Sequence, residues 1–174
     1  MPTSRSDRVE PGHVTGTTAA PNRAPETEVG RTQDAGFQIG VRRTVSFPPD
    51  VVWSGLTSHA GLSAWFGADI RDAAGTKVPA ADLLARGAQF TTVGGGEGEL
   101  RSVRPTDRIR ARYRPPERYA PTTVQIALVA AARGTALILH EEHLDSAHER
   151  EERRHHWRAV ADILVDIIEA HAKR

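Results

Sequence analysis

The chain has 174 residues, of which 39% are hydrophobic and 26% are charged, and its formal net charge is +1. This length favours one domain with a sizeable core over two domains. The balanced charge argues against a general attraction to nucleic acid or to anionic membranes, and the absence of cysteine excludes disulfides and thiolate metal sites. No apolar run approaches the roughly 20 residues that span a bilayer, and the N-terminus lacks the apolar segment of a secretory signal. We therefore expect a cytoplasmic protein.

The first 35 residues differ in composition from the rest of the chain. They are rich in Pro, Thr, Gly, Arg and Glu and contain almost no large apolar side chains. Such a segment cannot bury enough surface to offset the entropy lost on ordering. We predict a disordered tail over residues 1–35 and one domain over residues 36–174. The tail mixes acidic with basic residues, which argues against a basic arm for nucleic acid.

The domain is expected to begin with one strand and two short helices. Apolar residues alternate over 37–47, which predicts a strand that ends at the two following prolines. Short helices are predicted over 50–56 and 59–66. Gly67 is the glycine that commonly follows a helix C-terminus. Residues 71–87 are rich in Asp, Ala and Gly, and they predict a loop that contains one turn of helix.

Strands joined by tight turns dominate the second half of the domain. The alternation of apolar and polar residues predicts strands over 88–93, 97–103, 108–114, 122–131 and 135–144. The Gly94–Gly96 run, Pro105–Asp107 and Arg133-Gly134 lie between these strands and are typical turn sequences. The glycine run is followed by a strand, not by a helix N-terminus, so it predicts a hairpin turn and not a phosphate-binding loop.

The last predicted element is a long amphipathic helix over 149–171. Its apolar side chains recur at three- and four-residue steps and share one face, whereas charged residues occupy the other faces. Ser146 is the expected N-cap. Runs of strands beside segregated helices indicate an α+β fold with an antiparallel sheet. A curved sheet around one long C-terminal helix can hold a cavity between the two.

The order of these elements resembles the helix-grip, or START-like, superfamily, which is also called SRPBCC. Within it, the chain is similar to bacterial proteins related to the C-terminal domain of the heat-shock protein 90 ATPase activator. The stretches that carry the resemblance are 51–57, 62–66, 98–100, 104–109 and 135–140, followed by Trp157. The resemblance covers about residues 37–173 and implies a helix-grip fold. It leaves the function open, because the superfamily includes lipid carriers, polyketide cyclases, ring-hydroxylase subunits and cochaperones.

We expect the inward faces of the strands and of the last helix to line a pocket for a small hydrophobic molecule. The predicted lining residues are Trp65, Phe66, Phe90, Tyr113, Ile126, Leu128, Leu139, Trp157, Ala161 and Leu164. The same side chains can also fill a closed core, and this alternative stays open. The family resemblance adds His140, as a polar group near the mouth of the cavity.

A metal site is not expected, although histidines and carboxylates are dense near the last strand. His140 and Glu142 share one face of that strand, whereas Glu141 and His143 share the other. The adjacent carboxylates 141 and 142 are interpreted as surface charge. We expect no metal and no cofactor. The arginines at 108, 110, 112 and 114 are interpreted as a solvated sheet face and not as a nucleic-acid surface.

Two other classes of function remain open. The family resemblance implies a cochaperone-like or regulatory module with a protein partner. The expected absence of the activators' additional N-terminal domain argues against chaperone stimulation. A cyclase- or aromatase-like enzyme would use a pocket histidine, with His140 the nearest candidate, or a carboxylate as general acid or base. A second convergent catalytic group and a Gly-x-Ser-x-Gly elbow are both missing, so a non-enzymatic function is favoured.

Overall fold

The helices and strands of the structure agree closely with those predicted from the sequence. The computed structural model describes residues 31–32, 36–67, 70–72, 74–77, 79–84, 87–92 and 94–174. Its strands are β1 (Arg31–Thr32), β2 (Gly36–Val45), β3 (Gln89–Thr91), β4 (Glu97–Arg104), β5 (Arg108–Arg114), β6 (Thr122–Ala131) and β7 (Gly134–Leu144). Its helices are α1 (Pro49–Leu56), α2 (His59–Phe66), α3 (Ala80–Leu83) and α4 (Ala147–Ala172).

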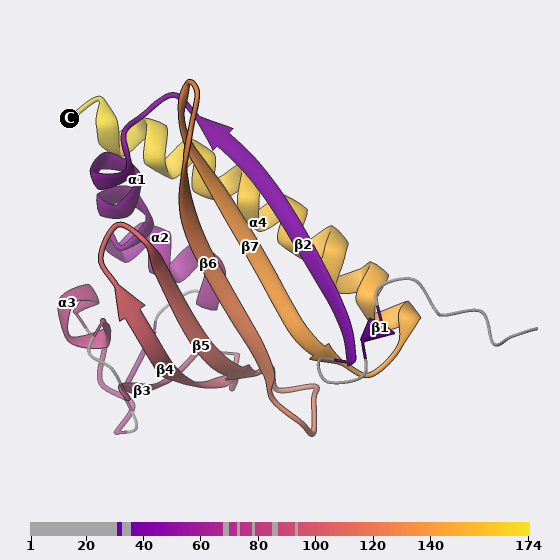
Figure 1. The fold of residues 1–174 in the computed structure, drawn as a ribbon. Helices are drawn as coiled ribbons and strands as arrows, with labels where there is room; N and C mark the ends of the chain where they lie inside the picture. The colour runs from indigo at the N-terminus through magenta and orange to yellow at the C-terminus, as the bar shows by residue number, and fades with distance from the viewer. Residues whose placement is uncertain are drawn as a thin grey trace, which may run out of the picture.

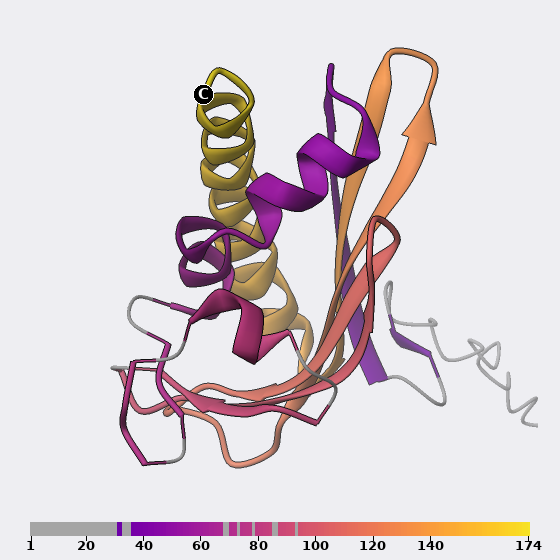
Figure 2. The same ribbon diagram turned by 90° about the vertical axis from the view of Figure 1, so that its left-hand side faces the viewer.

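The strands form one antiparallel sheet in the order β1-β2-β7-β6-β5-β4-β3. The helices lie on one side of this sheet, which curves around them (Figures 1 and 2). The long helix α4 packs against β2, α1, α2 and β7. The expected α+β architecture, with two short helices after the first long strand and one terminal helix against a curved sheet, is therefore confirmed. In the part of the chain that is described, no helix is both long and apolar enough to cross a membrane.

Local sequence explains how the helices begin. The Ser146 side chain accepts a hydrogen bond from the Glu149 backbone N–H at 3.1 Å, which confirms Ser146 as the N-cap of α4. Ser58 caps α2 in the same way through the Gly61 N–H, also at 3.1 Å. The first helix starts at Pro49, whose missing N–H costs nothing at that position.

Alternation along β7 decides which of its side chains face α4. Leu139 and Glu141 are buried, whereas His140 and Glu142 are only partly buried. The pairing of β7 with β2 then shifts register, and His143 adopts a φ of 68° at this point. Such a bulge adds one residue to the strand. The burial of Leu139 and Glu141 shows that their face of β7 is the one that covers the core.

The start of the domain differs from the sequence-based prediction. Arg31 and Thr32, which fall in the predicted tail, pair with Phe37 and Gly36. The remainder of that tail lies outside the described residues, as does residue 93 at the end of a predicted strand. The first long strand ends at Val45, two residues earlier than predicted.

Candidate ligand-binding site

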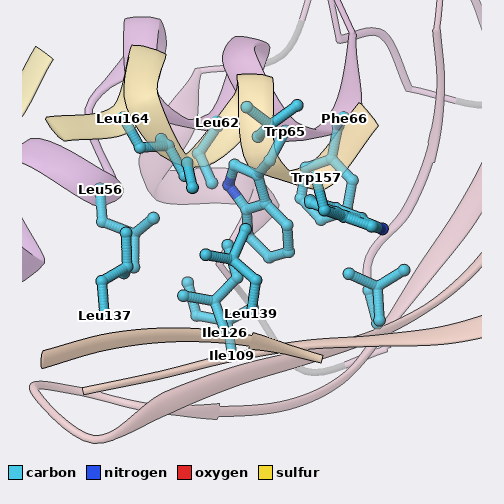
Figure 3. Packing of buried hydrophobic residues seen from close by; sticks show 14 of the residues in the cluster. Leu56, Leu62, Trp65, Phe66, Ile109, Ile126, Leu137, Leu139, Trp157 and Leu164 are labelled. Atoms are coloured by element: carbon cyan, nitrogen blue, oxygen red, sulfur yellow. The ribbon is translucent and has the colours of Figure 1, made fainter. Parts of the chain in front are cut away.

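The ten apolar residues predicted to line a pocket all lie in one core cluster between the sheet and the helices. Nine of them are buried, and Tyr113 is partly buried and packs against the others. Figure 3 shows Trp65 above Ile109, Ile126 and Leu139 of the sheet, with Trp157 to its right. Pockets of about 320 to 560 Å³ lie at the surface of the described part of the chain, and one of them, of about 560 Å³, borders Phe90. The low exposure of the core side chains shows that they pack closely against one another.

One part of this interior is aromatic. The ring centroid of Phe66 lies 4.0 Å from that of Trp65, 4.3 Å from that of Phe90 and 6.3 Å from that of Tyr113. Gly98 is the cross-strand partner of both Phe90 and Tyr113. A Cβ atom at Gly98 would collide with the Phe90 ring. The glycine therefore makes room for the aromatic cluster on the inner face of the sheet.

The hydroxyl of Tyr113 lies at the edge of this aromatic cluster. A Cβ atom at Gly96 would collide with that hydroxyl, so the glycine permits its close approach to the β3–β4 turn. Burial raises the pKa of Tyr113, and a hydrogen bond with Thr92 offsets part of the effect. The phenol therefore stays protonated at neutral pH and can donate a hydrogen bond.

A buried carboxylate occupies the same face of the sheet. The side chain of Glu141 is 0% exposed. Its Oε2 atom accepts hydrogen bonds from Trp157 Nε1 at 2.6 Å and from Arg153 Nε at 2.8 Å. The Arg153 guanidinium also lies 5.5 Å from the centroid of the Trp157 ring. Two residues of α4 thus bind one carboxylate oxygen of β7.

Glu141 Oε1 and Trp65 Nε1 are among the buried polar atoms that have no hydrogen-bond partner in the described residues. A buried polar group without a partner costs about 1–3 kcal/mol of stability. Water or a bound ligand satisfies such groups in most proteins. These atoms therefore mark the interior as a place where a polar atom from outside the chain would be stabilised.

His140 does not belong to this interior. Its Nδ1 lies 3.3 Å from Glu142 Oε1, and its cross-strand neighbour on β6 is Gln125. Because Leu139 and Glu141 face α4, alternation places His140 on the opposite side of the sheet. This position differs from the expected one at the cavity mouth, and it removes His140 as a general acid or base for chemistry in the interior. Within the described ranges, no group of three histidines or carboxylates is arranged to hold a metal ion.

Two charged residues of the site, Glu141 and Arg153, are not among the predicted lining residues. Their residue types indicate surface charge for Glu141 and a polar helix face for Arg153. Both positions carried a signal, since Glu141 follows the inward Leu139 by two residues and Arg153 precedes the inward Trp157 by one helical turn. In both cases the periodicity, and not the residue type, indicates the burial.

Comparison with known proteins identifies the family. The family described as "Activator of Hsp90 ATPase homolog 1-like protein" matches residues 46–169. Protein MLL2253 from Mesorhizobium loti is 16% identical and superposes with a TM-score of 0.61 over 76% of this chain and 97% of its own. CalU16 from Micromonospora echinospora is 24% identical, with a TM-score of 0.62 over 79% of this chain and 81% of its own.

A third similar structure is DynU16, a protein of the dynemicin biosynthetic locus. It is 20% identical, with a TM-score of 0.62 over 76% of this chain and 47% of its own. These low identities support the fold alone, and no curated protein matches the chain. The family match spans most of the domain that the strands and α4 form. The chain therefore belongs to the activator of Hsp90 ATPase homolog 1-like family, within the SRPBCC or START-like superfamily.

Proposed function

We propose that this protein binds a small, mainly apolar molecule in the interior between the sheet and α4. The observation that carries the proposal is the indole N–H of Trp65, which is buried without a partner inside an otherwise apolar, aromatic-rich core. An acceptor group on a ligand would satisfy this donor and recover the cost of its burial. Family membership supports the proposal, since the superfamily includes carriers of small apolar molecules.

A ligand would reach the interior where its lining is least covered. Tyr113 is only partly buried, and the Arg153 side chain retains 15% of its exposure. The neighbouring His156 is exposed on α4. A shift of these side chains opens the interior without breaking the strand pairing of the sheet, and we place the mouth of the site between them.

Tryptophan fluorescence and thermal unfolding test the proposal together. Naphthalene, 2-naphthol and a medium-chain fatty acid are titrated into the purified protein. Saturable quenching with a matching rise in Tm is expected, because a ligand that binds only the folded state stabilises it. The Trp65→Phe variant should lose the part of the quenching that comes from Trp65, whereas Trp53→Phe, a change in α1, should retain the full effect. If every probe left fluorescence and Tm unchanged, the proposal would be abandoned.

A protein partner is the second candidate, and a specific surface favours it. The Tyr119 side chain is fully exposed, at 101%. It borders a groove of about 560 Å³ that includes Arg112 and Arg114 and lies along β3, β4 and β5. Exposed aromatic and arginine side chains are enriched at protein interfaces. The family name points to an Hsp90-class chaperone, so the test compares the ATPase rate of purified Hsp90 with wild-type protein and with Tyr119→Ala. An unchanged rate with both proteins dismisses this candidate.

A further inference from the structure

We propose that Glu141 anchors the ligand through its free oxygen, Oε1, and that the ligand carries a neutral hydrogen-bond donor such as a phenol hydroxyl on an apolar body. This inference rests on the proposed function and names the chemistry of the molecule that the interior would take. It is carried by the hydrogen bonds of one buried side chain, by the charge around that side chain, and by its neighbours in the sheet.

The hydrogen bonds of Glu141 leave one oxygen for a ligand. Trp157 and Arg153 both donate to Oε2, at 2.6 and 2.8 Å. The other oxygen is buried and has no partner in the described part of the chain. A carboxylate oxygen only accepts hydrogen bonds. The missing partner must therefore be a donor, which excludes ethers, ketones and pure hydrocarbons as the anchored group.

The charge around Glu141 favours a neutral donor over an ammonium group. Arg153 already forms an ion pair with the carboxylate at 2.8 Å. A second cation would be buried next to the guanidinium, and like charges repel strongly in a poorly solvated site. The adjacent His156 reports this environment: partial desolvation and the charge of Arg153 both hold its pKa below the ordinary value. A hydroxyl donates without adding charge.

The neighbours of Glu141 in the sheet fit a ring-shaped body. Val124 on β6 pairs with Glu141, and Ala111 on β5 pairs with Val124, so the three form one row across the inner face. Tyr113 comes two residues after Ala111 and points to the same face. The two side chains between Glu141 and Tyr113 are short. Val124 and Ala111 are fully buried, so a flat aromatic ring would lie over them only after the side chains that cover them shift. Its hydroxyl would then point toward Glu141 and its far edge toward Tyr113.

The test compares two probes with the same ring system. 2-Naphthol carries a donor, whereas 2-methoxynaphthalene does not, and their Kd values are measured by isothermal titration calorimetry. The wild-type protein should bind 2-naphthol about tenfold more tightly, which is the value of one buried hydrogen bond to a charged acceptor. In Glu141→Gln the amide oxygen should take the Trp157 and Arg153 donors, so that the NH2 group faces the ligand. The preference for 2-naphthol should then disappear or reverse.

The control variant is Glu142→Gln, because Glu142 lies on the other face of β7 and contacts Arg110 and His140. This variant should keep the tenfold preference. If Glu141→Gln does not fold, the indole N–H resonance of Trp157 in the wild-type protein provides a second readout. It should shift with 2-naphthol and much less with 2-methoxynaphthalene.

Three results separate the outcomes. A tenfold preference that only Glu141→Gln removes, or a Trp157 shift specific to 2-naphthol, supports the anchor. Equal affinities of the wild-type protein for the two probes overturn the anchor and leave the proposed binding function standing. Failure of both probes to bind overturns the binding function and the anchor together.

Discussion

The two tryptophans that face the core differ in the hydrogen bonding of their indole groups. Trp157 donates to buried Glu141 at 2.6 Å, whereas Trp65 Nε1 has no partner among the described residues. The same substitution, Trp→Phe, should therefore have different costs at the two positions. Trp157→Phe leaves the carboxylate short of a donor and should cost about 1–3 kcal/mol more than Trp65→Phe. Urea unfolding of the two variants gives this difference.

A double-mutant cycle separates this hydrogen bond from packing. Combining Trp157→Phe with Glu141→Gln should recover part of the cost, because a neutral amide loses less than a carboxylate when one of its donors is removed. Two results together would contradict a stabilising Glu141–Trp157 hydrogen bond. They are additive changes in the free energy of unfolding in the double mutant, and an equal loss of stability in Trp65→Phe and Trp157→Phe.

Two glycines of the β3–β4 hairpin provide a second test at the residue scale. At Gly98, a methyl group would collide with the Phe90 ring, so Gly98→Ala must displace part of the aromatic cluster. We expect a loss of about 1–3 kcal/mol, which is typical of overpacking a core. At Gly94, no atom lies within 4 Å of an added Cβ, so Gly94→Ala serves as the matched control. Thermal unfolding should separate the two variants by several degrees; equal Tm values would contradict the packing described.

The residues of the site could be predicted only in part. Apolar side chains such as Trp65 and Leu164 follow the periodicity of their helices, and the structure places them in the core. Glu141 follows the alternation of its strand, but burial of a carboxylate depends on donors that lie far away in the sequence. Its partners Trp157 and Arg153 meet it only through the packing of α4 on β7. The unpartnered oxygen follows from that three-dimensional arrangement and not from any local pattern.

At the scale of elements, the loop between β5 and β6 is attached to the start of α4 by one arginine. The Arg118 side chain is only 7% exposed. It forms ion pairs with Asp145 at 2.9 Å and with Glu149 at 3.0 Å. Arg118→Met should destabilise the fold by about 1–3 kcal/mol, because Glu149 would lose its buried partner. Arg112→Met, at an exposed arginine of β5, is the control.

Hydrogen exchange locates the effect of Arg118→Met. The variant should exchange faster in the first turns of α4 and in the β5–β6 loop, while β2 and β7 remain protected. Uniform loss of protection, or no loss relative to Arg112→Met, would show that Arg118 does not hold these two elements together.

Most helices and strands could be predicted from local pattern, because caps, prolines and alternation all act over a few residues. The Ser146 cap of α4 is one example. The hairpin between β6 and β7 is another, although its turn lies at residues 132–133 and Gly134 is already the first residue of β7. The bulge at His143 and the short strand β1 could not be predicted, since both depend on the pairing partner. Arg31 and Thr32 have no strand pattern of their own, and they become a strand only by pairing with the start of β2.

At the scale of the whole molecule, acid should weaken the fold through identifiable groups. The pKa of His156 lies below 6.5 because of partial desolvation and the charge of Arg153. The native state therefore binds this proton less readily than the unfolded state. The free energy of unfolding should be at its full value above about pH 6.5 and should fall as the pH decreases below it.

A second acid-sensitive group acts at lower pH. A hydrogen bond from Arg43, at 2.7 Å, holds the pKa of Asp162 below 3.8, so its contribution is present above that pH and is lost as the pH falls through the lowered value. The free energy of unfolding, measured at several pH values, should change less steeply with pH than in the wild-type protein. This difference is expected below pH 6.5 in His156→Gln and below pH 3.8 in Asp162→Asn. Slopes equal to that of the wild-type protein would contradict these assignments.

Family and fold place this protein among domains that hold a helix against a curved sheet, but the volume inside such a fold depends on where the strands bend. That curvature cannot be predicted from the alternation of single strands. In the described residues, the interior is closely packed and yet retains polar atoms without a hydrogen-bond partner, among them Trp65 Nε1 and Glu141 Oε1. A ligand that displaces side chains near Tyr113 and Arg153 would reconcile the two observations.

The most direct test is native mass spectrometry of the protein purified from its own host, followed by extraction and identification of any bound molecule. The binding account predicts a reproducible adduct of one small apolar compound, which carries a hydroxyl or another neutral donor. The mass of the polypeptide alone, in repeated preparations under conditions that preserve non-covalent complexes, would contradict it and would give priority to the protein-partner function.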